Sequence, residues 1–368
     1  MPQAAPDAPE RAAWLRLLLT EGVGRDTARR LLAAFGDPRE VLAASPSARR
    51  QVAGAAAEAL QSPPAQWETH LAAMEAWLAA GPARMIWTLG DPAYPAALLQ
   101  TPDPPLLLFA QGDPAVLSRP ALAIVGSRNA TAQGLDNARA FARHLSEAGW
   151  AIVSGLARGI DAAAHEGALL GDGGTIAVVG TGPDRVYPSA HRALAHRIVE
   201  RGLILSEYAP GTPPLPLNFP LRNRLIAALS QGTLVVEAAL QSGSLITARL
   251  AAEAGREVFA VPGSIHAPQS RGCHALIRQG AKLVETAQDI LEELAPQLRP
   301  VAAASGAAAL EPADPLLDAL GNDPVTLDAL SARTGWPIAN LNVRLLELEL
   351  DGLVARLPGG LFQRRHAG

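Results

Sequence analysis

The feature that most constrains the fold is a series of short, wholly apolar runs between about residues 120 and 295, with helical patterning between them. Fully apolar strands separated by helices are typical of a parallel sheet that is covered on both faces. We therefore expect an α/β fold with a doubly wound parallel sheet over residues 120–296. The expected strands are ALAIVG, WAIVSG, TIAVVG, LILSE, TLVVE, REVFAVPG and AKLVE.

The segments on either side of this block have a different pattern. Residues 1–82 show the apolar period of helices and predict a small all-α domain, and the Pro-rich residues 83–119 are interpreted as a connector. Residues 297–314 have the composition of a low-complexity linker. Residues 315–368 show the order of three helices and a hairpin that is typical of a winged helix.

Composition excludes several classes of protein. With 49% hydrophobic residues the chain can bury a sizeable core, so it is not mostly disordered. No apolar run approaches the roughly 18–20 residues that cross a bilayer, and the N-terminal residues lack the apolar region of a secretory signal. The single cysteine, Cys273, allows neither an internal disulfide nor a cysteine metal site. We expect a soluble, cytoplasmic protein without membrane partners.

The charged residues give two conflicting indications about a polyanionic partner. A net charge of −4 at pH 7 does not by itself predict a polyanionic partner. However, of 31 lysines and arginines only Lys282 is a lysine. Codon bias would explain this composition, and so would a local need for planar guanidinium groups that bind phosphate and stack on bases. Only the positions of the arginines can decide between the two explanations.

Two glycine-containing turns follow consecutive expected strands, at the carboxyl edge where open α/β sheets bind ligands. Gly126, Ser127 and Arg128 follow the first strand, and Ser154 and Gly155 follow the second. Neither turn matches a dinucleotide-binding motif or a P-loop, so we predict no cofactor. The close backbone approach that glycine permits, together with helix N–H groups and Arg128, suits a phosphate.

The run from Asn218 to Arg224 is the strongest indication of ligand chemistry. It places Phe219 just ahead of Arg222, Asn223 and Arg224 at the start of an expected helix. An aromatic ring that stacks on a base and guanidinium groups that hold the backbone are what binding of single-stranded nucleic acid requires. The alternative is an ordinary helix start with a buried phenylalanine and exposed arginines.

Other positions could extend this surface. Ser242, Gly243 and Ser244 begin an expected helix, where they can cap the helix or hold an anion. Arg185 and Arg192 lie in a basic stretch that either extends a positive groove or covers a solvated helix face.

The N-terminal block contains a Gly-x-Gly hairpin formed by Gly22 and Gly24. Such a hairpin exposes N–H groups at a helix start, as in the helix-hairpin-helix motif that contacts DNA phosphates. The alternative is an ordinary connection between two helices with a glycine cap.

Three titratable residues could be taken for catalytic groups. Asp161 and His165, at i,i+4, are interpreted as a helix cap and a structural hydrogen bond, and no third metal ligand lies at a suitable spacing. Glu237 is interpreted as an ion-pair partner of neighbouring arginines rather than as a hydrolytic base. We predict no metal and no catalytic residue.

The segments of the central block together resemble the DprA family (DNA processing protein A, also called Smf). The resemblance implies an extended Rossmann-like fold that binds single-stranded DNA without cleaving it. It also implies a homodimer through this domain, protection of incoming strands and loading of the RecA recombinase in natural transformation. The matching segments are AIVGSRNATAQG, AIVSGLARGIDAAAHEGAL, YPSAHRALAHRI, LILSEYAPGTPP, NFPLRNRLIAALS, LVVEAALQSGSLITARLA, VFAVPGS and GCHALIRQGAKLV.

The resemblance also implies where DNA is bound. It carries DNA-binding roles onto residues 126–128, 154–155 and 218–224. Lysines contribute to DNA contact in relatives, and this chain has one lysine, so we expect arginine to take that role, with Arg185 or Arg192 as candidates.

The expected winged helix is not basic. From Leu316 onward six acidic residues face five basic ones, and its expected third helix, residues 337–350, carries two glutamates. Helices that read duplex DNA are usually basic, because phosphate contacts supply much of the affinity. We therefore expect this domain to contact protein, to regulate or to bind DNA weakly, which argues against a duplex-DNA regulator.

The competing hypothesis is a Rossmann-like nucleotide phosphoribohydrolase, in which a Pro-Gly-Gly phosphate turn lies near a catalytic glutamate. Here Glu237 precedes a Ser-Gly-Ser turn, and the turn at Pro262 and Gly263 follows a later strand. This order disfavours the enzyme.

Overall fold

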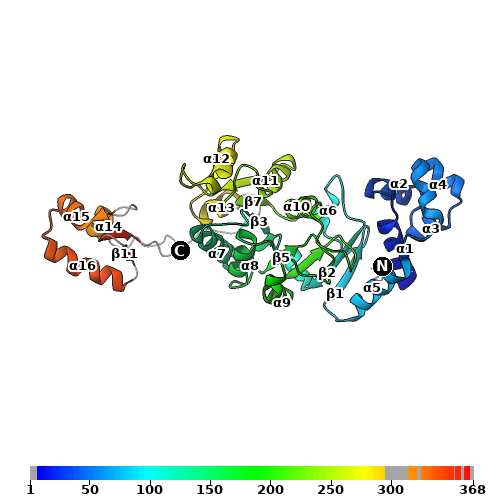
Figure 1. The fold of residues 1–368 in the computed structure, drawn as a ribbon, viewed down its shortest axis with the longest axis horizontal. Helices are drawn as coiled ribbons and strands as arrows, with labels where there is room; N and C mark the ends of the chain where they lie inside the picture. Colours follow the sequence, from blue (N-terminus) through cyan, green and yellow to red (C-terminus); the bar gives the residue numbers. More distant parts are fainter. Residues whose placement is uncertain (1–5, 295–313, 321–324, 352, 358–359, 365–368) are drawn as a thin grey trace, which may run out of the picture. The chain divides into compact units, whose positions relative to one another are not determined.

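The structure is a computed structural model, and it forms two compact units that are described separately here, Met1–Leu298 and Arg299–Gly368 (Figure 1). The residues that it describes are 6–294, 314–320, 325–351, 353–357 and 360–364.

The first unit is built on a nine-stranded sheet. Its strands are β1 (Arg84–Thr88), β2 (Leu107–Gly112), β3 (Ala121–Val125), β4 (Ala151–Ser154), β5 (Thr175–Val178), β6 (Leu203–Ser206), β7 (Gly232–Val235), β8 (Glu257–Ala260) and β9 (Lys282–Leu283).

The strand order is β1-β2-β6-β5-β4-β3-β7-β8-β9, and neighbours from β6 to β9 run parallel. Each apolar run that was predicted as a strand is one, so the Rossmann-like α/β fold is confirmed. Beginning at β3, the chain winds toward β6 on one side and toward β9 on the other. The carboxyl end of β3 is therefore the switch point at which such sheets bind ligands.

The interpretation of residues 83–119 as a connector differs from the structure. This segment contains β1 and β2, which extend the sheet in antiparallel fashion with Phe109 opposite Ser206. Neither strand contains a proline, because the prolines occupy the connection between the two strands, which contains the short helix α6 (Ala96–Leu99), and the segment that follows β2. The high proline content thus marks the segments between strands and not the absence of a sheet.

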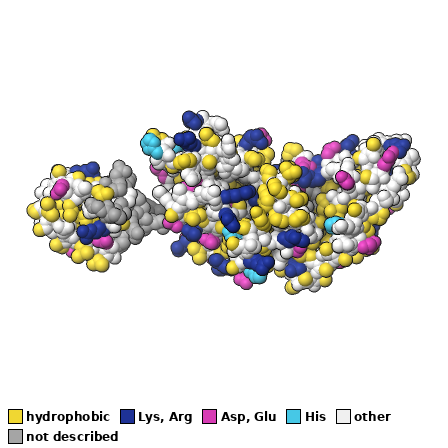
Figure 2. All heavy atoms as spheres, in the orientation of Figure 1, with side chains coloured by type: hydrophobic (Ala, Val, Ile, Leu, Met, Phe, Trp, Pro, Cys, Tyr) yellow, Lys and Arg dark blue, Asp and Glu magenta, His cyan; other side chains and the backbone are white. Residues whose placement is uncertain are grey.

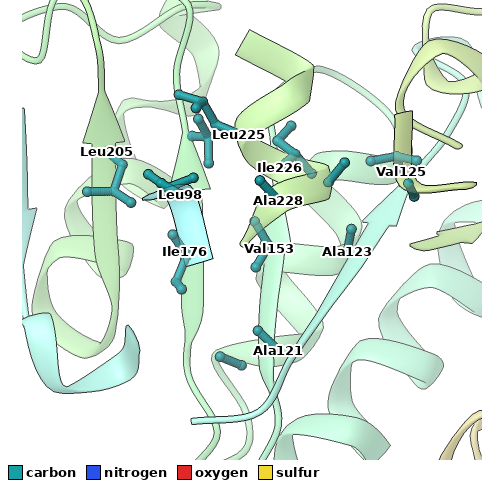
Figure 3. Packing of buried hydrophobic residues seen from close by; sticks show 14 of the residues in the cluster. Leu98, Ala121, Ala123, Val125, Val153, Ile176, Leu205, Leu225, Ile226 and Ala228 are labelled. Carbon is teal, nitrogen blue, oxygen red and sulfur yellow. The ribbon is translucent and has the colours of Figure 1, made fainter. Parts of the chain in front are cut away.

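Helices cover both faces of the sheet because its strands are apolar on both sides. In β3, Ala121, Ala123 and Val125 face one cluster of buried residues, while Leu122 and Ile124 face another. Figure 3 shows the first cluster, where the second half of α10 (Asn218–Ala228) packs over the strands. The helices and 3-10 turns of this part are α6 (Ala96–Leu99), η2 (Pro114–Ser118), α7 (Ala132–Glu147), α8 (Ile160–Ala168), η3 (Ser189–His191), α9 (Arg192–Arg201), α10 (Asn218–Ala228), α11 (Ser244–Glu253), η4 (Pro268–Ser270), α12 (Arg271–Arg278) and α13 (Ala287–Leu294).

The predicted helical N-terminal domain is present, and it shares its core with the sheet edge. Trp77 lies edge-on to Phe109 of β2, with ring centroids 5.8 Å apart, in a cluster that also holds Trp14, Leu31 and Leu107. Its elements are α1 (Ala8–Leu19), α2 (Arg25–Phe35), α3 (Pro38–Ala43), α4 (Pro46–Ala53), η1 (Gly54–Gln61) and α5 (Trp67–Ala79).

The second unit has the predicted winged-helix fold. Its three strands pair in the order β10-β12-β11, and Leu330, Leu345 and Phe362 lie in its core. The predicted linker, residues 297–314, lies outside the described residues except for its last position. The elements are α14 (Pro315–Leu320), β10 (Val325–Thr326), α15 (Leu327–Thr334), α16 (Ile338–Leu350), β11 (Val354–Leu357) and β12 (Leu361–Arg364). Across the described residues of both units, no helix is long and apolar enough to cross a membrane.

Candidate nucleic-acid interface

A cavity of about 520 Å³ lies at the carboxyl end of β3, at the switch point of the sheet. The loops after β3, β4 and β7 form its walls, together with the first turns of α10 and α11. It brings together most of the predicted contact residues. Those that line it are Gly126, Ser127, Arg128, Phe219, Arg222, Asn223, Ser242, Gly243 and Ser244.

An aromatic and cationic platform stands at this cavity, formed by Arg128, Tyr187 and Phe219. The Arg128 guanidinium carbon lies 5.7 Å from the centroid of the Phe219 ring, within the range of a cation–π contact. The Tyr187 ring lies 5.4 Å from that of Phe219 and is tilted by 34°. Gly180 makes room for Phe219, since a Cβ there would come within 3.0 Å of the ring.

Tyr187 was not among the predicted contact residues, although it is 50% exposed. The available signal was its position directly before Pro188 in the YPSAHRALAHRI segment. Pairing with Phe219, 32 positions later, is a tertiary contact that neither periodicity nor local sequence reveals.

Arg222 differs from the prediction that its guanidinium is free to bind a phosphate. The residue is only 3% exposed, and Nη1 donates to the carbonyl oxygens of Gly155, at 2.7 Å, and Val178. Burial lowers the pKa of Arg222 to about 10, so it stays protonated at neutral pH. Gly155 is required here because a Cβ would overlap this guanidinium. Arg222 therefore supplies positive charge at the cavity wall while it ties α10 to the sheet.

The loop after β4 is held by two buried polar side chains. Asp161 accepts a hydrogen bond from the N–H of Gly155 at 3.2 Å, and His165 Nε2 accepts one from the N–H of Leu156 at 3.3 Å. His165 Nδ1 lies 2.7 Å from the Thr175 hydroxyl. Burial lowers the pKa of His165 to about 3, so the imidazole is neutral.

These contacts give both residues a structural role, but Asp161 holds the preceding loop and does not cap α8, whose N-cap is Gly159. Leu156 has φ +57°, an uncommon value for a branched side chain, and the bond from His165 stabilises this turn. No cluster of three or more His, Cys, Asp or Glu side chains that could hold a metal occurs among the described residues.

Glu237 differs from the prediction that it pairs with arginines. Its carboxylate accepts hydrogen bonds from the N–H of Thr131 at 3.0 Å and from the Thr131 hydroxyl at 2.5 Å. The same hydroxyl accepts a bond from the N–H of Gly134 and so caps α7. The reason is topological: β7 pairs with β3, so Glu237 after β7 lies beside the loop after β3.

Arg224 also differs from the prediction of a free guanidinium. It pairs with Glu207, which Arg25 also contacts at 2.8 Å, and Asp103 bridges Arg25 and Arg29 at 2.6 Å each. We call these five residues the interdomain cluster, because they join α2, α10 and the end of β6. Burial raises the pKa of Glu207 and lowers that of Arg224.

Helix geometry explains why Phe219 and Arg224 have different surroundings. Five positions on an α-helix correspond to a rotation of about 140°. Phe219 therefore faces the cavity, and Arg224 faces the N-terminal domain.

The remaining predicted contact residues lie outside the cavity wall. The buried Ser154 hydroxyl donates to the Ile124 carbonyl at 2.7 Å, and the Asn218 amide donates to the Gly180 carbonyl at 3.2 Å. Arg185 is exposed beside Asp184, at 3.6 Å.

The N-terminal hairpin lies apart from the cavity. Gly22 has φ +82°, and Gly24 caps α2. Gly24 lines a separate hollow of about 370 Å³ beside the interdomain cluster.

Comparison with known proteins gives one consistent family. Residues 85–295 match DNA recombination-mediator protein A, residues 8–70 the DprA-like N-terminal HHH domain, and residues 300–360 the DprA winged helix domain. Protein Smf of Escherichia coli is 44% identical over 267 residues, which cover 70% of this chain and 71% of that protein. DprA of Streptococcus pneumoniae is 51% identical over 183 residues, 50% of this chain and 64% of that protein.

Two solved structures are also similar. The X-ray structure of DprA from Streptococcus pneumoniae has a TM-score of 0.67 and 38% identity, and the match covers 79% of this chain and 99% of that one. A DprA structure from Helicobacter pylori, described by its single-stranded DNA binding mode, has a TM-score of 0.53 and 34% identity, with 58% and 96% covered.

Proposed function

Because the chain belongs to the family of DNA recombination-mediator protein A, we propose that it binds single-stranded DNA in the cavity at the end of β3 and mediates recombination. In this role it protects incoming strands and loads the RecA recombinase during natural transformation, in the cytoplasm. The observation that carries the proposal is that the exposed Arg128 and Tyr187 both contact the Phe219 ring, at a cavity large enough for a nucleotide.

Each part of the cavity has a role in this proposal. A base stacks on the aromatic platform, because aromatic faces bind any base and so favour single strands without sequence preference. Arg128 neutralises a phosphate, and the start of α11, with the hydroxyls of Ser242 and Ser244, holds a second one. Arg222 and Gly155 keep the wall in shape and contribute charge rather than direct contacts.

Basic side chains are scattered among hydrophobic ones on the face shown in Figure 2. This distribution supports a local site rather than a broad electrostatic field. Arg185 and Arg192, both exposed, remain our candidates for the role that lysines play in relatives.

The protein acts without catalysis in this proposal. A nucleotide hydrolase would need a general base at the cavity, and Glu237 instead caps the loop after β3 through Thr131. This contact is what disfavours the phosphoribohydrolase.

The test is fluorescence anisotropy with a labelled oligo-dT of about 35 nucleotides and a duplex of equal length, across a salt series, since each phosphate contact adds to the salt dependence. We expect tight, salt-sensitive binding that favours the single strand. Equal or weak binding of both would contradict the proposal, and nucleotide hydrolysis would then be assayed.

We also propose that the protein forms a homodimer through the Rossmann-like domain. A hollow of about 530 Å³ between α11 and α12, lined by Leu245 and Leu276 and bordered by the 58% exposed Leu240, supports this proposal. Sedimentation velocity is the measurement, and Leu240→Arg should shift the protein toward the monomer. A dimer that persists unchanged would place the interface elsewhere.

A further inference from the structure

Helix α16 of the winged-helix unit carries an apolar stripe that no described residue covers. Val343, Leu346 and Leu350 are 62%, 57% and 80% exposed, and Ala339 is exposed one turn before them. The spacing of four, three and four residues is that of a coiled-coil seam. Figure 2 shows hydrophobic side chains at the surface where α16 runs in Figure 1.

This stripe is distinct from the face by which α16 joins its own domain. Leu341, Leu345 and Leu348 fill the winged-helix core and are almost completely buried. The exposed stripe is therefore not needed to hold the helix in place. Contiguous exposed apolar side chains usually mark an interaction surface.

The residues beside the stripe are acidic or neutral. At the flanking heptad positions lie Asn340 and Glu347 on one side and Asn342 and Glu349 on the other. The neighbouring Arg344 is engaged, since it pairs with Asp314 and with Glu347, each at 2.6 Å. The flanks thus present negative charge to whatever covers the stripe.

This charge pattern indicates which kind of partner would cover the stripe. Two fully overlapped copies of α16 paired along the stripe would place asparagines opposite the flanking glutamates, so no attractive ion pair would form across the seam. Duplex DNA would meet apolar and acidic groups where phosphate contacts require cations. An amphipathic helix whose apolar stripe is flanked by lysine or arginine satisfies both the apolar and the charged positions.

We propose that the face of α16 formed by Ala339, Val343, Leu346 and Leu350 is a docking surface for a basic amphipathic helix of a partner protein. The contact is short, because 13 residues span about 20 Å, or nearly two heptads. It therefore suits transient rather than permanent association. It does not depend on the DNA-binding proposal, which concerns the other unit.

The test uses the full chain and two labelled helical peptides of about 21 residues, with leucine at the seam positions and either lysine or glutamate at the flanks. By anisotropy, we expect the lysine peptide to bind at least tenfold more tightly than the glutamate peptide. The variant Leu346→Glu should lose at least tenfold affinity for the lysine peptide, whereas Leu170→Glu, at an exposed leucine in the other unit, should lose none. Both variants should melt and bind oligo-dT like the original chain.

A charge-reversal variant provides a second test of the proposal. Glu349→Lys should weaken binding of the lysine peptide and strengthen binding of the glutamate peptide. Equal affinity for both peptides, or an unchanged affinity of Leu346→Glu, would overturn the proposal. Self-association, or duplex binding, that Leu346→Glu abolishes would also overturn it, by assigning the face to a second copy or to DNA.

Discussion

Arg128 and Arg224 represent two different roles for an arginine near the DNA site, direct contact with DNA and support of the protein structure. Arg128 is exposed above Phe219 at the cavity, whereas Arg224 is committed to Glu207 in the interdomain cluster. A phosphate contact on a single strand contributes about 0.7 to the slope of log K against log salt. We therefore expect Arg128→Ala to reduce the magnitude of this slope by about 0.7 for oligo-dT.

The effect on affinity follows from the same contacts. Loss of an exposed phosphate contact and of the cation–π contact corresponds to ~1 kcal/mol, or about fivefold in Kd at moderate salt. The Kd of Arg128→Ala divided by the Kd of the original chain should fall by about 2.6-fold between 50 and 200 mM salt, because the variant releases one counterion contribution fewer on binding. Anisotropy titrations at four or more salt concentrations measure both quantities.

Arg224→Ala gives the opposite pattern. Glu207, only 3% exposed, would keep one of its two arginines, so the free energy of unfolding should fall by about 2 kcal/mol while the salt slope stays unchanged. Arg143→Ala, an exposed arginine paired with Glu147 away from the cavity, controls for general loss of charge. A lower slope for Arg224→Ala and an unchanged one for Arg128→Ala would refute the assignment.

Three further predictions follow from the site. Gly155→Ala should lower stability by about 2 kcal/mol in urea unfolding, since its Cβ overlaps the Arg222 guanidinium, and an unchanged midpoint would contradict this packing. Tyr187→Ala should weaken oligo-dT binding about fivefold while Tyr187→Phe retains it, and equal losses would remove ring stacking as the cause. Between pH 7 and pH 5 the free energy of unfolding should fall by about 2 kcal/mol on account of His165, whose pKa is about 3 when folded and about 6.5 when unfolded, so that only the unfolded chain takes up the proton. His165→Gln should flatten this pH dependence, and parallel pH profiles would count against the assignment.

Much of the fold could be predicted because the strands are buried on both faces. In β3, Ala121 to Val125 form an unbroken apolar run, and the runs assigned to the other parallel strands have the same character. The two antiparallel strands β1 and β2 were not predicted because proline-rich segments follow them. Their short apolar stretches therefore look like parts of a connector.

The residues of the site could be predicted from the sequence, but the directions of their side chains could not. Phe219, Arg222 and Arg224 all belong to one helix start, but the direction of each side chain depends on how α10 is rotated against the sheet. Leu225 and Ile226 pack into the core (Figure 3), and this packing decides the rotation of α10. The sequence identifies the residues at this edge, and tertiary packing decides which of them meet solvent.

The pairing of β2 with β6 has a consequence for synthesis on the ribosome. Phe109 of β2 lies opposite Ser206 of β6, so its partner strand emerges about 100 residues later, which at 5–20 residues per second takes roughly 5 to 20 s. During this interval the helical N-terminal block is complete in sequence, but the apolar strand that closes its core has no neighbour on one side. Newly made chains therefore carry an open, aggregation-prone strand edge until β6 has been translated. The N-terminal helices cannot complete their core before the sheet has been synthesised as far as β6.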